Sequence, residues 1–244
     1  MGFIMFERKF MLVSSIQNQT FTSRNNPIKD FKIITNKGTL FVKEFTAKDA
    51  SDRHNVYSLA KFFLDGFISN TEDPAFLRFA KPENKQNYLK FLDRMTDYYK
   101  AMFKNDDGNL TVLVAKDDKD KLAGAIVSNT LNEEGVSEKA TCYLDSIAVA
   151  PHLRNNKVGA ILENTILEWA KNVYTDAFLA SDNLAVGFQL KNGFRALNYL
   201  NPSERRIIDK INSVRGDYPD YVTYMDKKIA ESSVPWYERV KIKD

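Results

Sequence analysis

One stretch near the middle of the chain constrains the fold more than any other, because a strand, a basic loop and a helix follow one another there. Residues 143–149 are mostly apolar and include two β-branched side chains, as expected for a buried strand. Pro151 ends that strand, since proline has no N–H group to donate to a sheet. From Val158 to Val173 apolar residues recur every three or four positions, which predicts a helix that begins near Asn156.

The loop between this strand and this helix has the features of an anion-binding site. It contains Arg154 and Lys157, and the small residues Gly159 and Ala160 follow in the first helical turn. The N–H groups of a first turn have no partner within the helix, and the helix dipole favours negative charge there. A glycine in that turn lets a ligand approach the backbone closely. We therefore expect a phosphate or pyrophosphate group to bind here.

The spacing of this segment points to one kind of phosphate ligand. The P-loop pattern and the G-x-G-x-x-G dinucleotide pattern are both absent from the sequence. The order Val149, Pro151, Arg154, Gly159 resembles motif A of the GNAT family of acetyl-CoA-dependent N-acetyltransferases, V-x-P-x-x-[QR]-x-x-G-x-[GA]. Lys157 stands where the motif has its first glycine, and its side chain could re-aim the pyrophosphate.

A second segment, DNLAVGFQLKNGF, resembles motif B of the same family, N-x-x-A-x-x-L-Y-x-x-x-G-F. The residues that fit the motif are Ala185, Phe188, Gly193 and Phe194. Asp182 stands at the usual asparagine with Asn183 beside it, and Gln189 stands at the usual tyrosine. An amide cannot donate a proton as an acid, so the acid that protonates the leaving thiolate is unassigned. Tyr98 and Tyr99, in a predicted helix, are expected to pack in the core.

The remaining elements follow in the order that the family has. Periodicity predicts strands at 40–45, 110–116, 121–130, 143–149, 176–180 and 221–227, and helices at 46–67, 82–103, 156–173 and 182–192. This order resembles the GNAT fold, an α/β fold whose mixed, mostly antiparallel central sheet is flanked by helices. We expect an N-terminal extension at 1–37, the acetyltransferase domain at 38–230 and a C-terminal tail at 231–244. A helical insertion is predicted at 203–214, and the sequence VKIK in the tail could add an edge strand.

The resemblance implies acetyl-CoA as cosubstrate and assigns its contacts. The expected contact residues are Ile147, Ala148, Val149, Arg154, Asn155, Asn156, Lys157, Val158, Gly159, Ala160 and Asn183. The strand residues would pair with the pantetheine arm as an added strand. The backbone amide of Ala148 would polarise the thioester carbonyl.

Asp145 is the candidate acceptor of the proton that an amine must lose before it attacks. Strand alternation places it on the same face as Ile147 and Val149. Many members of the family have a glutamate at this position, acting as a base or holding a water. An ordinary aspartate has a pKa near ~3.9 and is a weak base, so the alternative is a carboxylate that only hydrogen-bonds a strand or the substrate.

Two classes of function stay open. The first is an active N-acetyltransferase whose acceptor is a primary amine on a small molecule or a protein. The second is a degenerate module that binds CoA or a partner protein without catalysis. Lys157 and Gln189 favour the second class, while Arg154, Gly159 and Asp145 favour the first.

Composition limits the partners and the cellular compartment that we expect. A net charge of +3 with scattered lysines argues against nucleic acid. The single cysteine, Cys142, excludes an internal disulfide and is consistent with the cytoplasm, and with only two histidines we expect no metal site. Charged residues interrupt the apolar run at 1–16, so we expect neither a signal peptide nor a membrane span. The protein could be a monomer or a homodimer.

Overall fold

The structure is a computed structural model that describes residues 27–69, 71, 74–106, 110–133, 136–215, 222–231, 234–239 and 241–242. Its strands are β1 (Phe31–Thr35), β2 (Gly38–Glu44), β3 (Thr111–Lys116), β4 (Leu122–Glu133), β5 (Val136–Val149), β6 (Asp176–Asp182), β7 (Arg195–Ala196), β8 (Val222–Lys228) and β9 (Lys241–Ile242). Its α-helices are α1 (Ala47–Ala50), α2 (Arg53–Ile68), α3 (Pro74–Leu77), α4 (Lys85–Lys104), α5 (Val158–Ala170), α6 (Val186–Lys191), α7 (Pro202–Arg215) and α8 (Trp236–Arg239). Short 3-10 turns are η2 (Arg78–Ala80), η3 (Pro82–Asn84), η4 (Pro151–Leu153) and η5 (Asn183–Ala185).

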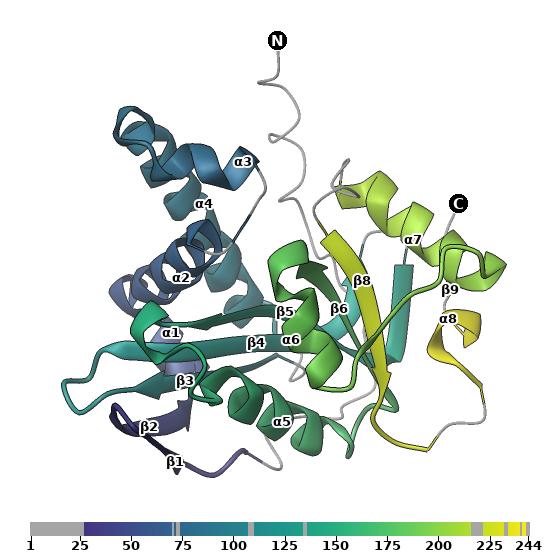
Figure 1. Cartoon of the computed structure of the whole chain (residues 1–244), viewed down its shortest axis with the longest axis horizontal. Helices are drawn as coiled ribbons and strands as arrows, with labels where there is room; N and C mark the ends of the chain where they lie inside the picture. The colour runs from purple at the N-terminus through teal and green to yellow at the C-terminus, as the bar shows by residue number, and fades with distance from the viewer. Residues whose placement is uncertain are drawn as a thin grey trace.

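The described strands form one sheet in the order β1-β2-β3-β4-β5-β6-β8-β7, and β9 pairs with the start of β5. Neighbouring strands are antiparallel except β5 and β6, which run parallel. Helices α5 and α6 lie in front of this sheet in Figure 1, while α2 and α4 lie toward one end and α7 toward the other. This is the α/β fold with a mixed, mostly antiparallel sheet that the sequence predicts.

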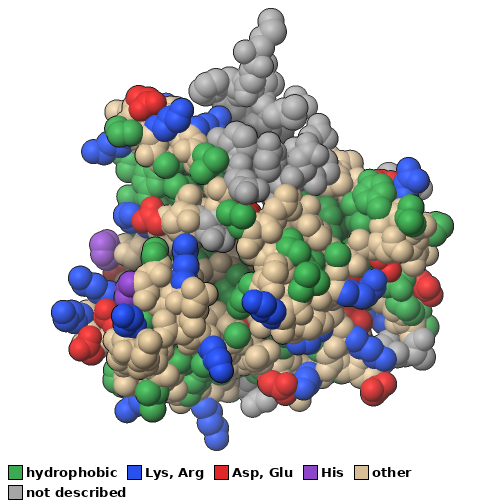
Figure 2. Space-filling model, in the orientation of Figure 1, with side chains coloured by type: hydrophobic (Ala, Val, Ile, Leu, Met, Phe, Trp, Pro, Cys, Tyr) green, Lys and Arg blue, Asp and Glu red, His purple; other side chains and the backbone are tan. Residues whose placement is uncertain are grey.

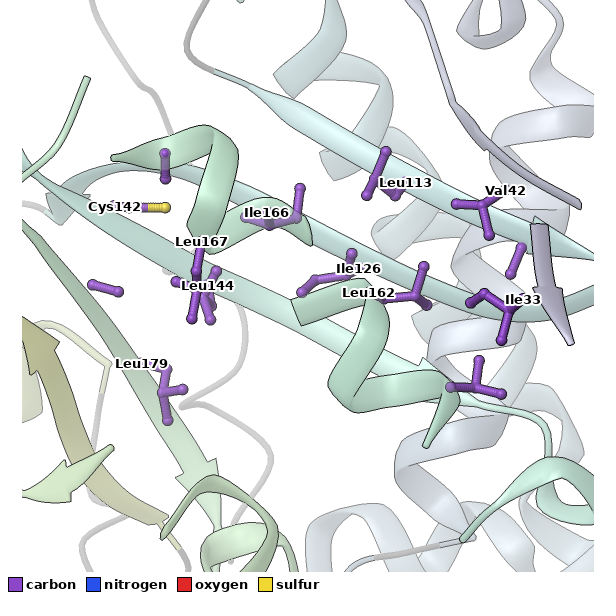
Figure 3. Close-up of a cluster of buried hydrophobic side chains, with 14 of the residues drawn as sticks. Ile33, Val42, Leu113, Ile126, Cys142, Leu144, Leu162, Ile166, Leu167 and Leu179 are labelled. Atoms are coloured by element: carbon purple, nitrogen blue, oxygen red, sulfur yellow. The ribbon is translucent and has the colours of Figure 1, made fainter. Parts of the chain in front are cut away.

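The helix α5 packs on one face of the sheet. Its residues Leu162 and Ile166 are completely buried against strand residues such as Leu113, Ile126 and Leu144 (Figure 3). Burying an apolar side chain of this size contributes about 1.5–3 kcal/mol, so this layer holds the β5–α5 unit in place.

Two further clusters of buried hydrophobic residues lie on the opposite face of the sheet. Along β3, Leu113 packs under α5 whereas its neighbour Val112 packs with α2 and α4, because successive side chains of a strand point to opposite faces. Along β6, Leu179 likewise belongs to the α5 face, and Phe178 packs with Ile207 of α7. Helices α4 and α7 therefore stand on the same face of the sheet, on either side of β5.

Residues beyond both predicted domain boundaries pack with the sheet and the core. The sheet begins before residue 38, because Phe31–Thr35 forms β1 and pairs antiparallel with β2. The tail belongs to the core, since Trp236 is 1% exposed and its Nε1–H donates to Asp226 Oδ2 at 2.8 Å. Long-range contacts of this kind have no local sequence signature. The predicted helical insertion at 203–214 is confirmed by α7. A capping box at Thr46 opens α1.

Among the helices of the described residues, none is long and apolar enough to cross a membrane. Residues 1–16, to which the prediction about membrane segments also applied, lie outside the described residues.

Candidate active site

The parallel strands β5 and β6 separate at the centre of the sheet. They pair only from Thr141 to Tyr143 on β5 and from Asp176 to Phe178 on β6. Both strands continue beyond this point, β5 to Val149 and β6 through residue 182, without further pairing between them. This separation of β5 from β6, the split, exposes one backbone edge of β5. Helices α4 and α7 lie on one face of the sheet beside the split, and α5 and α6 lie on the other face.

The pairing register decides which backbone groups reach that edge. The Ala150 N–H donates to the Ala123 carbonyl of the β4 side at 2.9 Å. Ala148 pairs with Ala125 in the same register, two residues earlier. Because hydrogen-bonded and non-hydrogen-bonded pairs alternate in an antiparallel ladder, the Ala148 N–H also points to β4.

The amides of Ile147 and Val149 therefore point into the split, and the predicted role of the Ala148 amide is wrong. That amide is committed to the ladder with β4 and is not available to a thioester carbonyl. The carbonyl of Val149 confirms the direction, because it accepts a hydrogen bond from Arg154 Nε at 3.3 Å on the side away from β4. The sequence does not show which alternate amides of β5 point to β4 and which point into the split, because this depends on where the ladder with β4 starts.

A β-bulge carries Asp145 to the opposite face from Ile147 and Val149. On β4, Val127 pairs with Ser146 and the next residue pairs with Leu144, so Asp145 is an extra residue in β5. Beyond the bulge Ile147 and Val149 pack toward α5. The prediction that Asp145 shares their face is wrong, because the bulge shifts the alternation by one residue.

Hydroxyl groups surround the Asp145 carboxylate on the α4 side. Ser146 Oγ–H donates to Oδ2 at 2.8 Å, and Tyr98 O–H donates to Oδ1 at 3.4 Å. Ser146 Oγ also lies 3.0 Å from Tyr99 Oη, which links the carboxylate to the buried core. Burial, and then the Asp145 charge, raise the pKa of Tyr99, so its phenol stays protonated at neutral pH. The sequence analysis expected Tyr98 to pack in the core and did not consider Ser146, since only the bulge turns the Asp145 carboxylate toward both hydroxyl groups.

The loop before α5 has the backbone shape that suits a glycine-rich turn. Asn155 and Lys157 both have left-handed conformations, with φ of 65° and 61°. Lys157 is the N-cap of α5, and no side chain caps the helix there. The N–H groups of Val158, Gly159 and Ala160 have no partner within the helix, as in any first turn. Asn156 supports the loop, since its Nδ2–H donates to the Arg154 carbonyl at 3.1 Å.

Arg154 joins this loop to the end of α2. Its Nη2–H donates to Ser69 Oγ at 2.7 Å, and its Nε–H donates to the carbonyl of Val149. The guanidinium thus lies beside the open edge of β5 and beside the C-terminus of α2, where the helix dipole favours a cation. Its contact with a phosphate remains a prediction.

Gly159 faces protein atoms, whereas the sequence analysis expected it to face the ligand. A Cβ atom at this position would lie 3.3 Å from Phe188 Cζ and 3.4 Å from Val149 Cγ2. The glycine therefore allows Phe188 of α6 to pack against the first turn of α5. Its absent side chain sets the spacing of the two helices beside the split.

The end of β6 forms the other side of the split. Asp182 caps η5 by accepting from the Leu184 N–H at 2.9 Å, and it also accepts from Thr71 Oγ1 at 2.6 Å. Asn183 is exposed beside this cap, and Thr223 Oγ1 donates to its Oδ1 at 3.5 Å. Its predicted contact with the cofactor stays a prediction.

Comparison with known proteins now assigns the family. Residues 75–194 match the model of the acetyltransferase (GNAT) family. Residues 75–194 of this chain are a GNAT acetyltransferase domain. The matched segment covers β5, the loop with Arg154, and α6, so the split strands and the loop lie within the GNAT domain.

The chain is also similar to solved structures of acetyltransferases. An acetyltransferase of the GNAT family from Staphylococcus aureus Mu50 is 15% identical with a TM-score of 0.50, and the match covers 78% of this chain and 99% of that one. PaiA N-acetyltransferase from Thermoplasma acidophilum in complex with coenzyme A is 13% identical with a TM-score of 0.49, covering 78% and 98%. No curated protein sequence matches the chain.

The described residues give little support to metal-dependent catalysis or to a cysteine nucleophile. It contains no group of three or more His, Cys, Asp or Glu side chains that could hold a metal ion. Burial raises the pKa of the Cys142 thiol to about 12, so this residue is no nucleophile at neutral pH. On the face shown in Figure 2, Lys and Arg side chains are dispersed among acidic and apolar ones.

Proposed function

We propose that this protein transfers the acetyl group of acetyl-CoA to a primary amine, on a small molecule or on a protein. The GNAT domain supports acetyltransferase activity with acetyl-CoA as the donor. The observation that carries the finer proposal is the position of Asp145. It precedes Ile147, whose amide points into the split, by two residues. The bulge turns its side chain toward α4 and away from α5.

The described residues fit acetyl-CoA in two places. Phosphate oxygens would accept hydrogen bonds from the free N–H groups at the start of α5, next to the charges of Lys157 and Arg154. An extended arm would pair with the free backbone groups of Ile147 and with the Val149 N–H. These amides are also the candidates to polarise the acetyl carbonyl, in place of Ala148.

The proton of the amine is the reason for a carboxylate at this site. A primary amine has a pKa of about 10.4, so it arrives as an ammonium that cannot attack. Ser146 and Tyr98 donate hydrogen bonds to the Asp145 carboxylate, whose negative charge would attract the ammonium into the site. Asp145 takes one proton from the ammonium, directly or through a water, and the neutral amine nitrogen then bonds to the acetyl carbon. The carbon–sulfur bond breaks, and the second N–H proton leaves to water or to the departing thiolate.

The leaving thiolate does not require a described acid. Gln189 occupies the motif position of the usual tyrosine, and it is buried beside Glu163. A thiol with a pKa of about 8.5 leaves as an anion without assistance. The free, buried Cys142 is consistent with a reducing compartment, and we place the reaction in the cytoplasm.

The variant Asp145→Asn tests this proposal. It keeps the size of the side chain and can still accept from Ser146, but it neither carries charge nor accepts the amine proton. We expect kcat to fall by about 10²–10⁴-fold in an assay of thiol release with a panel of primary amines, while the KM for acetyl-CoA changes little. Tyr98→Phe is the matched control, since it removes one hydrogen bond to the carboxylate and leaves the charge.

Three other results would contradict parts of the proposal. A higher acceptor KM with an unchanged pH–rate profile would limit Asp145 to holding the ammonium. An unchanged kcat would remove Asp145 from the reaction. If acetyl-CoA raises the Tm of the wild type but no amine of the panel releases thiol, the degenerate module is favoured.

A further inference from the structure

A carboxyl group is enclosed between the two helices that border the split. Glu163 of α5 is 0% exposed, although it carries an ionisable group. Its Oε1 accepts a hydrogen bond from Asn192 Nδ2, just after α6, at 2.7 Å. Gln189 of α6 lies against the same carboxyl. This cluster is separate from Asp145, which the bulge places on the other face of the sheet.

Two buried acceptors of this cluster have no hydrogen-bond donor among the described residues. Within the described part of the chain, Glu163 Oε2 and Gln189 Oε1 are buried oxygens that have no hydrogen-bond partner. Buried polar atoms in native proteins are almost always paired, since an unpaired acceptor loses its water without compensation. A proton on Glu163 Oε2 would turn one of these two acceptors into a donor.

The nearby positive charge does not compensate for an ionised carboxylate at close range. Lys227 of β8 is the charged group that acts on Glu163 from a neighbouring element. Its Nζ–H donates to the backbone carbonyl of Asn192 at 2.6 Å and not to the carboxyl. From α6, the groups that face Glu163 are the neutral amides of Gln189 and Asn192.

We propose that Glu163 is a neutral carboxylic acid in the native protein and acts as a positioning residue that fixes α6 against α5. In this role it keeps Phe188, which is next to Gln189 in α6, packed against the first turn of α5 at Gly159. That turn is the phosphate site of the proposed function, and to this extent the inference rests on that function. The positioning itself needs no cosubstrate.

The acid–base properties of Glu163 set the pH range of this assignment, because the neutral acid is the main form below about pH 7. Burial raises the pKa of Glu163 to about 7 from an ordinary value of 4.5, against the smaller opposing effects of Asn192, Gln189 and Lys227. Because the folded pKa is the higher one, the stability that this group contributes is complete at low pH. It is lost as the pH rises from the ordinary value through about 7.

Thermal unfolding without acetyl-CoA tests the protonation state. Tm would be measured from about pH 5 to about pH 9 for the wild type, for Glu163→Gln and for Glu168→Gln, an exposed control on the same helix. Glutamine resembles the neutral acid, so Glu163→Gln should match the wild type at the acidic end. At the alkaline end it should exceed the wild type by roughly 5 °C or more, and Glu168→Gln should follow the wild type throughout. Parallel curves for wild type and Glu163→Gln would overturn the proposal.

Hydrogen exchange and kinetics test the positioning. Glu163→Leu removes the bond to Asn192, so the amides of α6 should exchange roughly tenfold faster or more, while Glu163→Gln restores their protection. The KM for acetyl-CoA should rise by about tenfold in Glu163→Leu with a smaller change in kcat. Unchanged exchange in Glu163→Leu would overturn the positioning role. If the wild type fails to bind acetyl-CoA, the proposed function is refuted, whereas Tm and exchange still decide this proposal.

Discussion

The distance between α2 and β5 depends on a single glycine, and replacing it should separate the two elements. A Cβ atom on Gly66 of α2 would lie 2.9 Å from the Cβ of Ala148 in β5. Carbon atoms in favourable contact are about 3.5–4.0 Å apart, so Gly66→Ala requires a shift of roughly 0.6–1.1 Å. The contact joins the helix whose end holds Arg154 to the strand whose edge faces the split.

Two effects of Gly66→Ala oppose each other, and their magnitudes decide the sign. Overpacking a well-packed core costs about 1–3 kcal/mol. An alanine in a helix interior stabilises it by about 0.5–1 kcal/mol relative to glycine. The central values differ by about 1.3 kcal/mol, which is the expected net loss of unfolding free energy. Gly187→Ala in α6 is the matched control, because nothing lies within 4 Å of its Cβ position, and it should be stabilising.

A double-mutant cycle in urea unfolding would isolate the contact. Ala148→Gly removes the opposing Cβ, so combining it with Gly66→Ala should recover the overpacking cost and give a coupling energy of about 1–3 kcal/mol. A coupling energy near zero, or a gain in stability equal to that of Gly187→Ala, would refute the argument that this glycine sets the α2–β5 distance.

Other changes test the loop and the tail. Arg154→Ala should weaken acetyl-CoA binding by about 1.5–3 kcal/mol in calorimetry, and an unchanged Kd would confine Arg154 to its contact with Ser69. Lys157→Gly should also weaken binding, more at low salt if the ammonium reaches a phosphate, whereas tighter binding would show that the side chain obstructs. Trp236→Phe leaves Asp226 without its indole donor and should cost about 1–3 kcal/mol in unfolding free energy; a stability equal to that of the wild type would make the tail peripheral to the core.

Local sequence patterns determined most of the elements. The apolar period of α5, the capping box of Thr46 and the helical insertion at 203–214 are written in neighbouring residues, because helices form between residues close in the chain. The spacing from Val149 to Gly159 indicated, for the same reason, the loop and helix at which we propose the anion site. The two motifs and the element order were enough to indicate the family.

The tertiary structure decided which atoms face the split. One extra residue in β5 moved Asp145 to the α4 face, and a bulge has no reliable sequence signature because it depends on the partner strand. The Ala148 amide points to β4 and belongs to the ladder, whereas the amides of Ile147 and Val149 point into the split.

The ends of the domain and the burial of Glu163 were also decided by contacts between distant segments. Strand β1 belongs to the sheet because β2 folds back on it, and the tail belongs to the core because Trp236 reaches Asp226. Sequence alone determined the local elements and their order. Only the packed chain decided which faces, edges and charges those elements present, because pairing register and burial depend on residues far apart in the sequence.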